Sequence, residues 1–154
     1  MTTHQAHFEH LVGYLGDIAG TKFPIINNSC TLVDSNTNDE KIVLELPEGS
    51  DLLMLHRLIS TMPTDASTKK AKALQLLTLN SQPDKLQGAW FCIDPDSDGI
   101  HLMLGQPIEN LNNQQFENLV FNYVELADQL MDEVNNDRPD TGGLDSSAFQ
   151  GIQV

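Results

Sequence analysis

Apolar residues recur at helical spacing near the start of the chain. They occupy positions i, i+3, i+4, i+7 and i+10, namely Phe8, Leu11, Val12, Leu15 and Ile18. Such a stripe predicts an amphipathic helix, which Thr3 can cap at its start and Gly20 can end. The glycines at positions 13 and 16 each cost this helix about 1 kcal/mol relative to alanine. We therefore expect packing to hold the helix, or its backbone to lie close to another segment.

Three strand-like segments follow the first helix. They are CTLVD (30–34), KIVLEL (41–46) and DLLMLHRLI (51–59). A polar turn rich in Asn and Asp separates the first two, and Pro47, Glu48 and Gly49 form a turn before the third. Two successive antiparallel hairpins make a meander. The leucines of the third segment would suit a helix as well.

The segment KKAKALQLLTL (69–79) predicts a short helix with apolar residues on more than one side. These residues fall in two adjacent groups, Ala71, Leu74 and Leu77, and beside them Ala73, Leu76 and Leu79. That is more apolar surface than one sheet needs for cover, so we expect part of it to face a partner. Lysines at positions 69, 70 and 72 stand where the helix dipole disfavours cations, so they either face acidic groups or are solvated.

A second hairpin and a long helix complete the predicted fold. The segments GAWFCID (88–94) and GIHLMLGQPI (99–108) flank a PDSD turn and predict the hairpin. Asn112 can cap a helix over 113–134, whose apolar stripe persists for five turns. The order α-β-β-β-α-β-β-α indicates one α+β domain, with helices packed against a twisted antiparallel sheet. Residues 139–154 are rich in Gly, Ser and Asp, so we expect the domain to span 1–138 and a disordered tail to follow.

The chain is strongly acidic, and this charge limits the classes of partner that we expect it to bind. Its 154 residues include 22 acidic and 8 basic residues, a net charge of −14. Residues 86–154 hold 12 of the acids and a single base, Arg138. Such a surface repels phosphate backbones and anionic lipids, so neither nucleic acid nor membrane is expected as a partner. There is no signal-peptide pattern and no apolar run near the ~20 residues of a membrane span. Cys30 and Cys92 fit no disulfide framework, so we expect a soluble cytosolic protein with free thiols.

The most suggestive chemical motif is DPDSDG at 94–99, which matches the first half of a calcium-binding EF-hand loop. The twelfth position of that loop should be a bidentate glutamate, and here it is Gly105. We therefore interpret the motif as an acidic hairpin turn and expect no calcium binding. His4, His7 and His10 share helical spacing but have no further ligand nearby, so we expect solvated histidines rather than a metal site.

No residues in the sequence suggest catalysis. There is no nucleophile elbow, no phosphate-binding glycine loop, and no basic cluster beside either cysteine. His56 and His101 fall in predicted strands, where we expect surface or sheet-edge positions. Glu125, Asp128, Asp132 and Glu133 crowd the last helix away from its apolar stripe, so we expect a solvated face. We expect no enzyme activity, cofactor or metal.

Several local sequences resemble the class I chaperones of type III secretion, the Tir chaperone family. The resemblance covers about residues 5–135 and rests on FEHLVGYLG, CTLVD, IVLEL, DLLMLHRLI, LLTLN, GAWFCIDPDSDGIHLML and PIENLNNQQFENLVFNYVELADQL. Its most specific part is LLTLN, followed by a hairpin and then a proline before the long helix. Pro24 and the tail after Arg138 depart from the family pattern and leave the subclass and effector open.

This resemblance implies a bacterial cytoplasmic chaperone that forms homodimers and uses no ATP or other cofactor. It would hold the N-terminal segment of a secreted effector in extended form and deliver it to the export machinery, whose ATPase is a further candidate partner. The acidic surface fits an extended, amphipathic and relatively basic segment. Two alternatives stay open, a small α+β adaptor that binds a folded partner, and an enzyme or ligand carrier with a deep pocket.

Two surfaces are expected to carry these interactions. Candidate contacts for the partner are Phe8, Leu11 and Leu15 on the first helix and Thr31, Leu32 and Val33 on a strand edge. The helix residues could equally serve only to pin that helix to its own core. Candidate contacts for the homodimer are Leu74 and Leu77, with Trp90 and Cys92 on the neighbouring strand that the resemblance implies.

Overall fold

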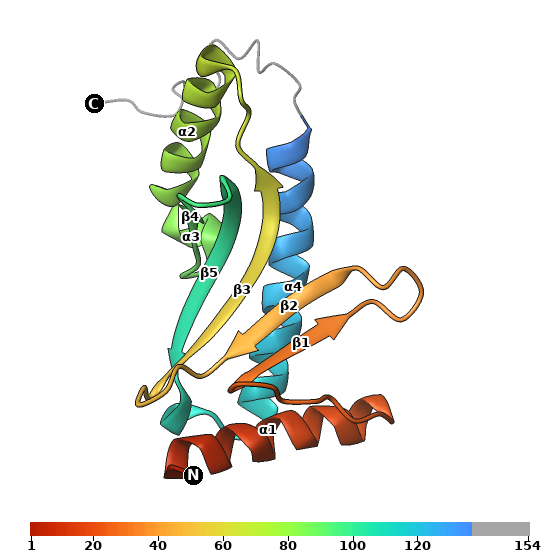
Figure 1. Cartoon of the computed structure of the whole chain (residues 1–154). Coiled ribbons are helices and arrows are strands. Elements are labelled where there is room, and N and C mark those ends of the chain that lie inside the picture. The colour runs from red at the N-terminus through yellow and green to blue at the C-terminus, as the bar shows by residue number, and fades with distance from the viewer. Residues whose placement is uncertain (137–154) are drawn as a thin grey trace, which may run out of the picture.

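The computed structural model of the chain describes residues 1–136 (Figure 1). Its elements are α1 (Thr3–Ala19), β1 (Ser29–Val33), β2 (Glu40–Glu45), β3 (Leu52–Thr61), α2 (Ala66–Asn80), α3 (Pro83–Leu86), β4 (Trp90–Ile93), β5 (Gly99–Pro107), the 3-10 turn η1 (Ile108–Asn110) and α4 (Asn113–Asn135). The expected α+β order is confirmed, and the third strand-like segment is a strand. Two short elements, α3 and η1, had not been expected. The expected tail, 139–154, lies outside the described residues.

The five strands form one antiparallel sheet in the order β1-β2-β3-β5-β4. Its longest pairing joins β3 to β5, from Leu52 opposite Pro107 to Thr61 opposite Gly99, with an irregularity between Leu58 and Ser60. Because the final hairpin places β5 beside β3, the meander β1-β2-β3 and the hairpin β4-β5 share a single sheet. The two edges of that sheet are β1 and β4.

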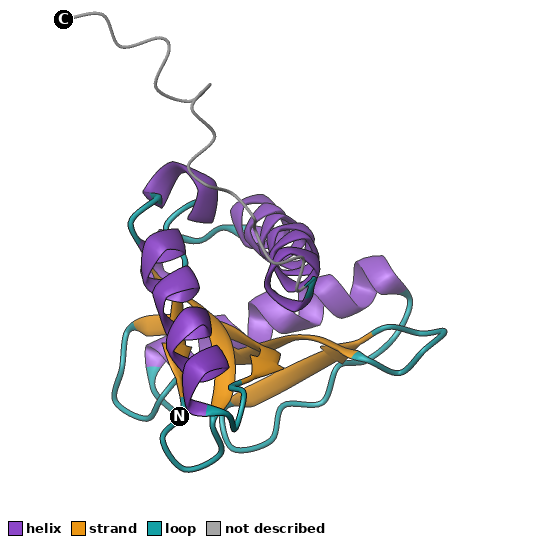
Figure 2. Cartoon of the chain, turned by 90° about the horizontal axis from the view of Figure 1, so that it is seen from above, coloured by secondary structure: helices purple, strands orange, loops and turns teal. Residues whose placement is uncertain are grey.

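The core lies between one face of the sheet and α4 (Figures 1 and 2). From the sheet it contains Ile42, Leu44, Leu53, Leu55, Ile100 and Leu102, and from α4 it contains Phe116, Val120, Tyr123, Ala127, Leu130 and Val134. The Tyr123 hydroxyl also donates a hydrogen bond across this layer to the carbonyl of Leu102 at 2.7 Å. Helix α1 crosses the end of the molecule beside η1 and the start of α4.

Helix α1 begins one residue earlier than expected, because Thr2 rather than Thr3 is its N-cap. Thr2 and Gln5 form a capping box, and Gly20 ends the helix in the left-handed region (φ 67°). A Cβ at Gly16 would lie 2.7 Å from the carbonyl oxygen of Thr21. This close approach explains a glycine inside the helix, and it agrees with the expectation that the helix backbone lies against another segment.

Helix α2 is longer than the expected 69–79, because Asp65 caps it through the Thr68 N–H. Its three lysines have different environments. Lys69 faces an acid, Asp98, at 3.5 Å, and Lys70 is exposed. Lys72 is buried and donates to the carbonyl of Val134 in the last turn of α4. A cation is favourable at the C-terminal end of a helix, so Lys72 joins α2 to α4. Lys72 thus neither faces an acidic side chain in this contact nor is solvated, which were the two expectations.

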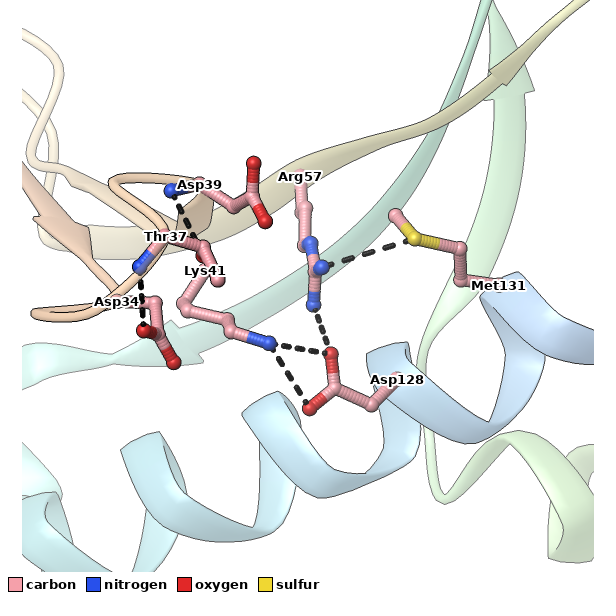
Figure 3. Close-up of polar contacts among 7 residues, drawn as sticks. All are labelled: Asp34, Thr37, Asp39, Lys41, Arg57, Asp128 and Met131. Carbon is pink, nitrogen blue, oxygen red and sulfur yellow. Dashed lines mark hydrogen bonds and ion pairs between the residues drawn. The ribbon is translucent and has the colours of Figure 1, made fainter.

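One carboxylate of α4 is part of an ion-pair network rather than of a solvated face (Figure 3). An oxygen of Asp128 lies 2.6 Å from Nη1 of Arg57 on β3 and 3.1 Å from Nζ of Lys41 on β2. The Arg57 side chain is only 5% exposed, and its Nη2 also reaches the sulfur of Met131 at 3.7 Å. The solvated-face interpretation was therefore wrong for Asp128, because strand and helix periodicities alone do not show that these side chains meet.

The network makes the charge of Asp128 part of the fold. Burial raises the pKa of this carboxyl, but hydrogen bonds and charges from Arg57 and Lys41 outweigh that effect and leave its pKa below the usual value. Arg57 Nε is buried without a hydrogen-bond partner among the described residues. The guanidinium therefore depends on Asp128 for compensation of its buried charge.

We expect Asp128→Asn to lower the free energy of unfolding by about 2–3 kcal/mol, because it leaves the buried Arg57 charge without a counter-ion. The value lies below that for a fully buried pair, because water reaches the Asp128 side chain, which is 47% exposed. Urea denaturation at pH 7 measures the change. Adding Arg57→Met to the Asp128→Asn background should restore part of the loss.

Glu125→Gln is the matched control, since this exposed carboxylate lies on the same helix and its loss should cost no more than about 0.5 kcal/mol. Equal effects of the two substitutions would contradict the role of the network. Because the folded-state pKa of Asp128 is lowered, its contribution is fully present above the unfolded-state pKa of about 3.9. It is lost as the pH falls from there through the folded-state pKa, and Asp128→Asn should remove this pH dependence.

Candidate functional site

The β1 edge of the sheet carries backbone groups that face away from the other strands. Ile26 and Ser29 exchange two backbone hydrogen bonds, at 2.8 and 3.0 Å, so the N–H and C=O of Ser29 point away from β2. Alternate residues of an antiparallel strand direct these groups to the same side. The N–H and C=O of Thr31 therefore point to the outer edge, while those of Cys30 and Leu32 point toward β2.

The side chains of β1 divide between solvent and core. Thr31 and Val33 are exposed, Leu32 is half-buried against the core, and Cys30 is buried. Two of the three expected strand contacts are thus accessible to a partner, together with the open backbone groups of Thr31. This edge has the features that strand addition requires, namely N–H and C=O groups with no backbone partner within residues 1–136, beside exposed side chains.

The candidate contacts on α1 lie elsewhere. Phe8, Leu11 and Leu15 are 1%, 0% and 5% exposed, and all three belong to the core. Of the two interpretations open for them, the structure shows core packing. Direct contact with a partner would require α1 to shift, and it stays a prediction.

Two histidines of α1 contact the segment that begins α4, and of these His10 is exposed as expected whereas His7 is half-buried. Nε2 of His7 lies 2.8 Å from the Leu111 carbonyl, and Nε2 of His10 lies 3.1 Å from Oδ1 of Asn113. The two rings stack with their centroids 6.4 Å apart. These contacts join α1 to the segment that begins α4, so the spacing of the histidines serves docking of the helix.

The turn next to the β1 edge is acidic. Asp34, Asp39 and Glu40 lie where β1 returns to β2, with Lys41 as a neighbouring base. Hydrogen bonds from the N–H groups of Asn36 and Thr37 lower the pKa of Asp34, so it stays ionised well below neutral pH. A basic segment that approaches β1 would meet favourable charge here.

A second accessible surface lies on α2 and β4, which are neighbours in the fold. Leu74 is 56% exposed, Leu77 65% and Trp90 40%, whereas Leu76 and Leu79 on the other side of α2 are buried. Cys92 is half-buried. Helix α2 therefore has two apolar sides, of which one covers the core and the other is exposed. We call Leu74, Leu77 and Trp90 the α2–β4 patch.

Further exposed apolar side chains were not among the expected contacts. Leu58 is 48% exposed, Ile93 40% and Phe121 57%. Leu58 alternates with the buried Arg57 and Ile59 along β3, so strand periodicity could have placed it on the open face once the segment was known to be a strand. Phe121 lies off the apolar stripe of its helix, which is the only sequence signal for its exposure.

The DPDSDG segment is a hairpin turn, as expected. It joins β4 to β5, and the Asp94 carboxylate accepts hydrogen bonds from the Asp96 N–H at 3.0 Å and the Ser97 hydroxyl at 2.7 Å. Asp98 adopts a left-handed conformation, with φ 56°. Within residues 1–136 no three His, Cys, Asp or Glu side chains are placed to hold a metal ion. The absence of calcium binding remains a prediction.

His56 and His101 were expected at the surface or at a sheet edge; they lie on the central strands β3 and β5, so the sheet-edge alternative was wrong. Both are half-buried on the face opposite α4, with ring centroids 6.4 Å apart. Nε2 of His56 is 3.3 Å from an oxygen of Glu45 on β2. The error arose because the strand order brings β5 between β3 and β4, which the sequence pattern does not reveal.

Neither cysteine of the described residues is activated as a nucleophile. Burial raises the pKa of the Cys30 thiol to about 11, and burial together with the Asp94 charge raises that of Cys92, so both resist conversion to the reactive thiolate. A polar pocket between α3 and α4 is lined by Gln87, Asn122, Glu125, Leu126 and Gln129. That lining contains no serine, cysteine or histidine. No helix in the described part of the chain is long and apolar enough to cross a bilayer.

Solved structures share this fold. A chain of the HopA1–SchA chaperone–effector complex matches with a TM-score of 0.63 and 14% identity, over 86% of this chain and 98% of that one. A chain of the ExsC–ExsE complex matches with a TM-score of 0.65 and 14% identity, over 85% and 95%. A chain of the heterodimeric ExoU–SpcU complex, from the type III secretion system of Pseudomonas aeruginosa, gives 0.54 and 20%, over 78% and 93%. At these identities the likeness concerns the fold.

The sequence itself gives a more specific relationship. No curated protein sequence matches the chain. The sequence pattern of the Tir chaperone protein (CesT) family, however, matches residues 10–131. These residues extend from within α1 to the last turns of α4. The match therefore includes both accessible surfaces, the β1 edge and the α2–β4 patch. This chain belongs to the Tir chaperone protein (CesT) family.

Proposed function

We propose that this protein is a type III secretion chaperone of the bacterial cytoplasm. It binds the N-terminal chaperone-binding segment of one or more effectors, keeps that segment extended and competent for secretion, and aids its delivery to the export apparatus, with the secretion ATPase as a further partner. The observation that carries the proposal is the family match over residues 10–131. The complexes whose chains share this fold support it, since one is described as a chaperone–effector complex.

The β1 edge is the proposed site for the effector segment. A strand added there can pair with the N–H and C=O of Thr31 and contact the exposed side chains of Thr31 and Val33. The net charge of −14 favours a segment more basic than the chaperone, and long-range attraction would raise its association rate. Backbone hydrogen bonding depends little on which side chains the added strand carries, so one edge can accept segments of different sequence.

The α2–β4 patch is the proposed homodimer interface. Leu74, Leu77 and Trp90 form an exposed apolar surface on neighbouring elements, and a two-fold arrangement would place each copy's patch against the same patch of the other. Cys92 would lie at its margin. Because the patch belongs to α2 and β4 and the effector edge to β1, dimerisation leaves the effector edge free.

The direct test is capture of the tagged protein from its native host under secretion-inducing conditions, with identification of the partner by mass. We expect a secreted protein whose bound segment is unfolded when free. A partner that is folded when free would favour the adaptor alternative.

Thr31→Pro should weaken effector binding without unfolding the chaperone. Proline removes the N–H that faces the open edge and places a ring in the path of an added strand, whereas the β1–β2 pairing does not use that N–H. We expect at least about a 10-fold loss of affinity for the captured effector segment, a change of about 1.4 kcal/mol. Titration calorimetry measures this affinity.

Thr31→Val is the matched control, because it changes the same side chain but keeps the backbone donor. It should bind within a few-fold of the wild type. Thermal denaturation of both variants establishes that the fold persists. Wild-type affinity in a folded Thr31→Pro variant would remove β1 from the proposal.

Leu74→Asp should convert the dimer to monomers. The side chain is 56% exposed in the single chain, so a carboxylate is tolerated there, but at a two-fold interface it would bury two unpaired charges. Light scattering at micromolar concentration should give twice the chain mass of 17.0 kDa for the wild type and the chain mass for the variant.

Asn118→Asp adds the same charge at an exposed position of α4 and should remain dimeric. A wild-type protein of 17.0 kDa would refute the dimer. A dimeric Leu74→Asp variant would instead place the interface on another surface.

A further inference from the structure

The β4 edge of the sheet differs from the β1 edge, because a side chain of α2 occupies it. Oδ1 of Asn80 accepts a hydrogen bond from the Phe91 N–H at 2.8 Å, and its Nδ2 donates to the Phe91 carbonyl at 3.1 Å. Phe91 pairs across β4–β5 with Leu102, and its own N–H and C=O point away from β5 to reach Asn80. Both backbone groups at this position of the edge are therefore satisfied.

The carboxamide of Asn80 takes the place of a neighbouring strand. A primary amide presents one donor and one acceptor side by side, and these match the pair that a peptide strand would offer to Phe91. A second contact closes the preceding edge position, since the Ala89 N–H donates to the carbonyl of Leu86 in α3 at 2.9 Å. β4 has only four residues, and of these Phe91 and Ile93 direct their N–H and C=O groups outward. Asn80 therefore occupies one of the two outward positions of the strand, and Ile93 at its far end is the other.

Packing and capping of α2 hold Asn80 beside Phe91. Leu76 and Leu79 anchor the last turn of α2 in the core. The helix ends at Ser81, whose hydroxyl donates to the Thr78 carbonyl at 2.6 Å. An aspartate at position 80 would lose the donor, and a glutamine would place the amide one methylene farther out. The asparagine that ends the segment LLTLN thus has a specific structural task.

We propose that Asn80 closes the β4 edge against strand addition and so makes the two edges of the sheet unequal. A strand that approaches β4 finds the Phe91 N–H and C=O already paired, whereas one that approaches β1 finds those of Thr31 open. The closure concerns the sheet alone. Its consequence, that one chain accepts one effector strand and only at β1, rests on the proposed function.

Amide hydrogen exchange tests the closure directly. In the full-length wild-type protein the Phe91 amide should be protected although it faces an outer edge, and Asn80→Ala should raise its exchange rate by about 10-fold. The Leu102 amide, in the central strand β5, should change much less, which separates local opening from global unfolding. An unprotected Phe91 amide in the wild type, or unchanged protection in Asn80→Ala, would overturn the proposal.

Ser81→Ala is the matched control. It removes a side-chain hydrogen bond from the same end of α2 but leaves the Asn80 amide in place. Phe91 should stay protected in this variant. Equal loss of protection in both variants would mean that fraying of the helix, and not the Asn80 amide, opens the edge.

Self-association provides the second readout, and it needs no effector. With its edge open, Asn80→Ala should form species larger than the wild type as concentration rises, because an unpaired strand edge is a template for another strand. Light scattering on wild type, Asn80→Ala and Ser81→Ala measures this. A variant with an exposed Phe91 amide but wild-type mass at every concentration would overturn the protective role. Neither readout involves effector capture, so failure of the proposed function would leave this result unaffected.

Discussion

The antiparallel pairing of β3 with β5 supports every other part of this protein. It is the longest pairing in the sheet, and each of its strands carries one further partner, β2 on one side and β4 on the other. Helix α4 packs mainly on β3, and its Tyr123 hydroxyl reaches the Leu102 carbonyl of β5. Arg57 lies within this layer, so β3 brings a permanent charge into the core, and α4 can pack there only with Asp128 to match it. The central pair thus determines both the apolar contacts and the ionic contact of the fold.

The order and type of the main elements could be predicted from periodicity, because stripes and alternation record which side of an element is buried. The helix predicted over 113–134 and observed over 113–135 is one example, and the turn at 94–99 is another. What periodicity cannot show is which elements meet. Asp128 was interpreted as a solvated carboxylate because its partners come from β2 and β3. A sheet-edge position stayed open for His101 because the strand order was unknown. The short helix α3 has too few residues for any period to be visible.

The candidate site was predictable to a similar degree. The excess of apolar positions on α2 correctly indicated that Leu74 and Leu77 do not both serve the core. The stripe of α1 gave no such indication, since Phe8, Leu11 and Leu15 form a single face that the core takes entirely. The contact of Asn80 with Phe91 could not be predicted from the sequence, because it requires the end of α2 to lie beside β4 in space. A polar residue at a helix end is usually interpreted as a cap. Here the cap is Ser81, the residue after Asn80.

The position of Trp90 gives this protein a spectroscopic reporter of its own. It is the single tryptophan of the chain, it lies on the short strand β4, and it is 40% exposed. Its immediate neighbour in the chain is Phe91, whose backbone pairs with Asn80. Tryptophan emission therefore arises from one site, at the junction of α2, β4 and the proposed two-fold interface. Changes in its wavelength or quenching would describe that junction alone, without labels and without interference from the β1 end of the sheet.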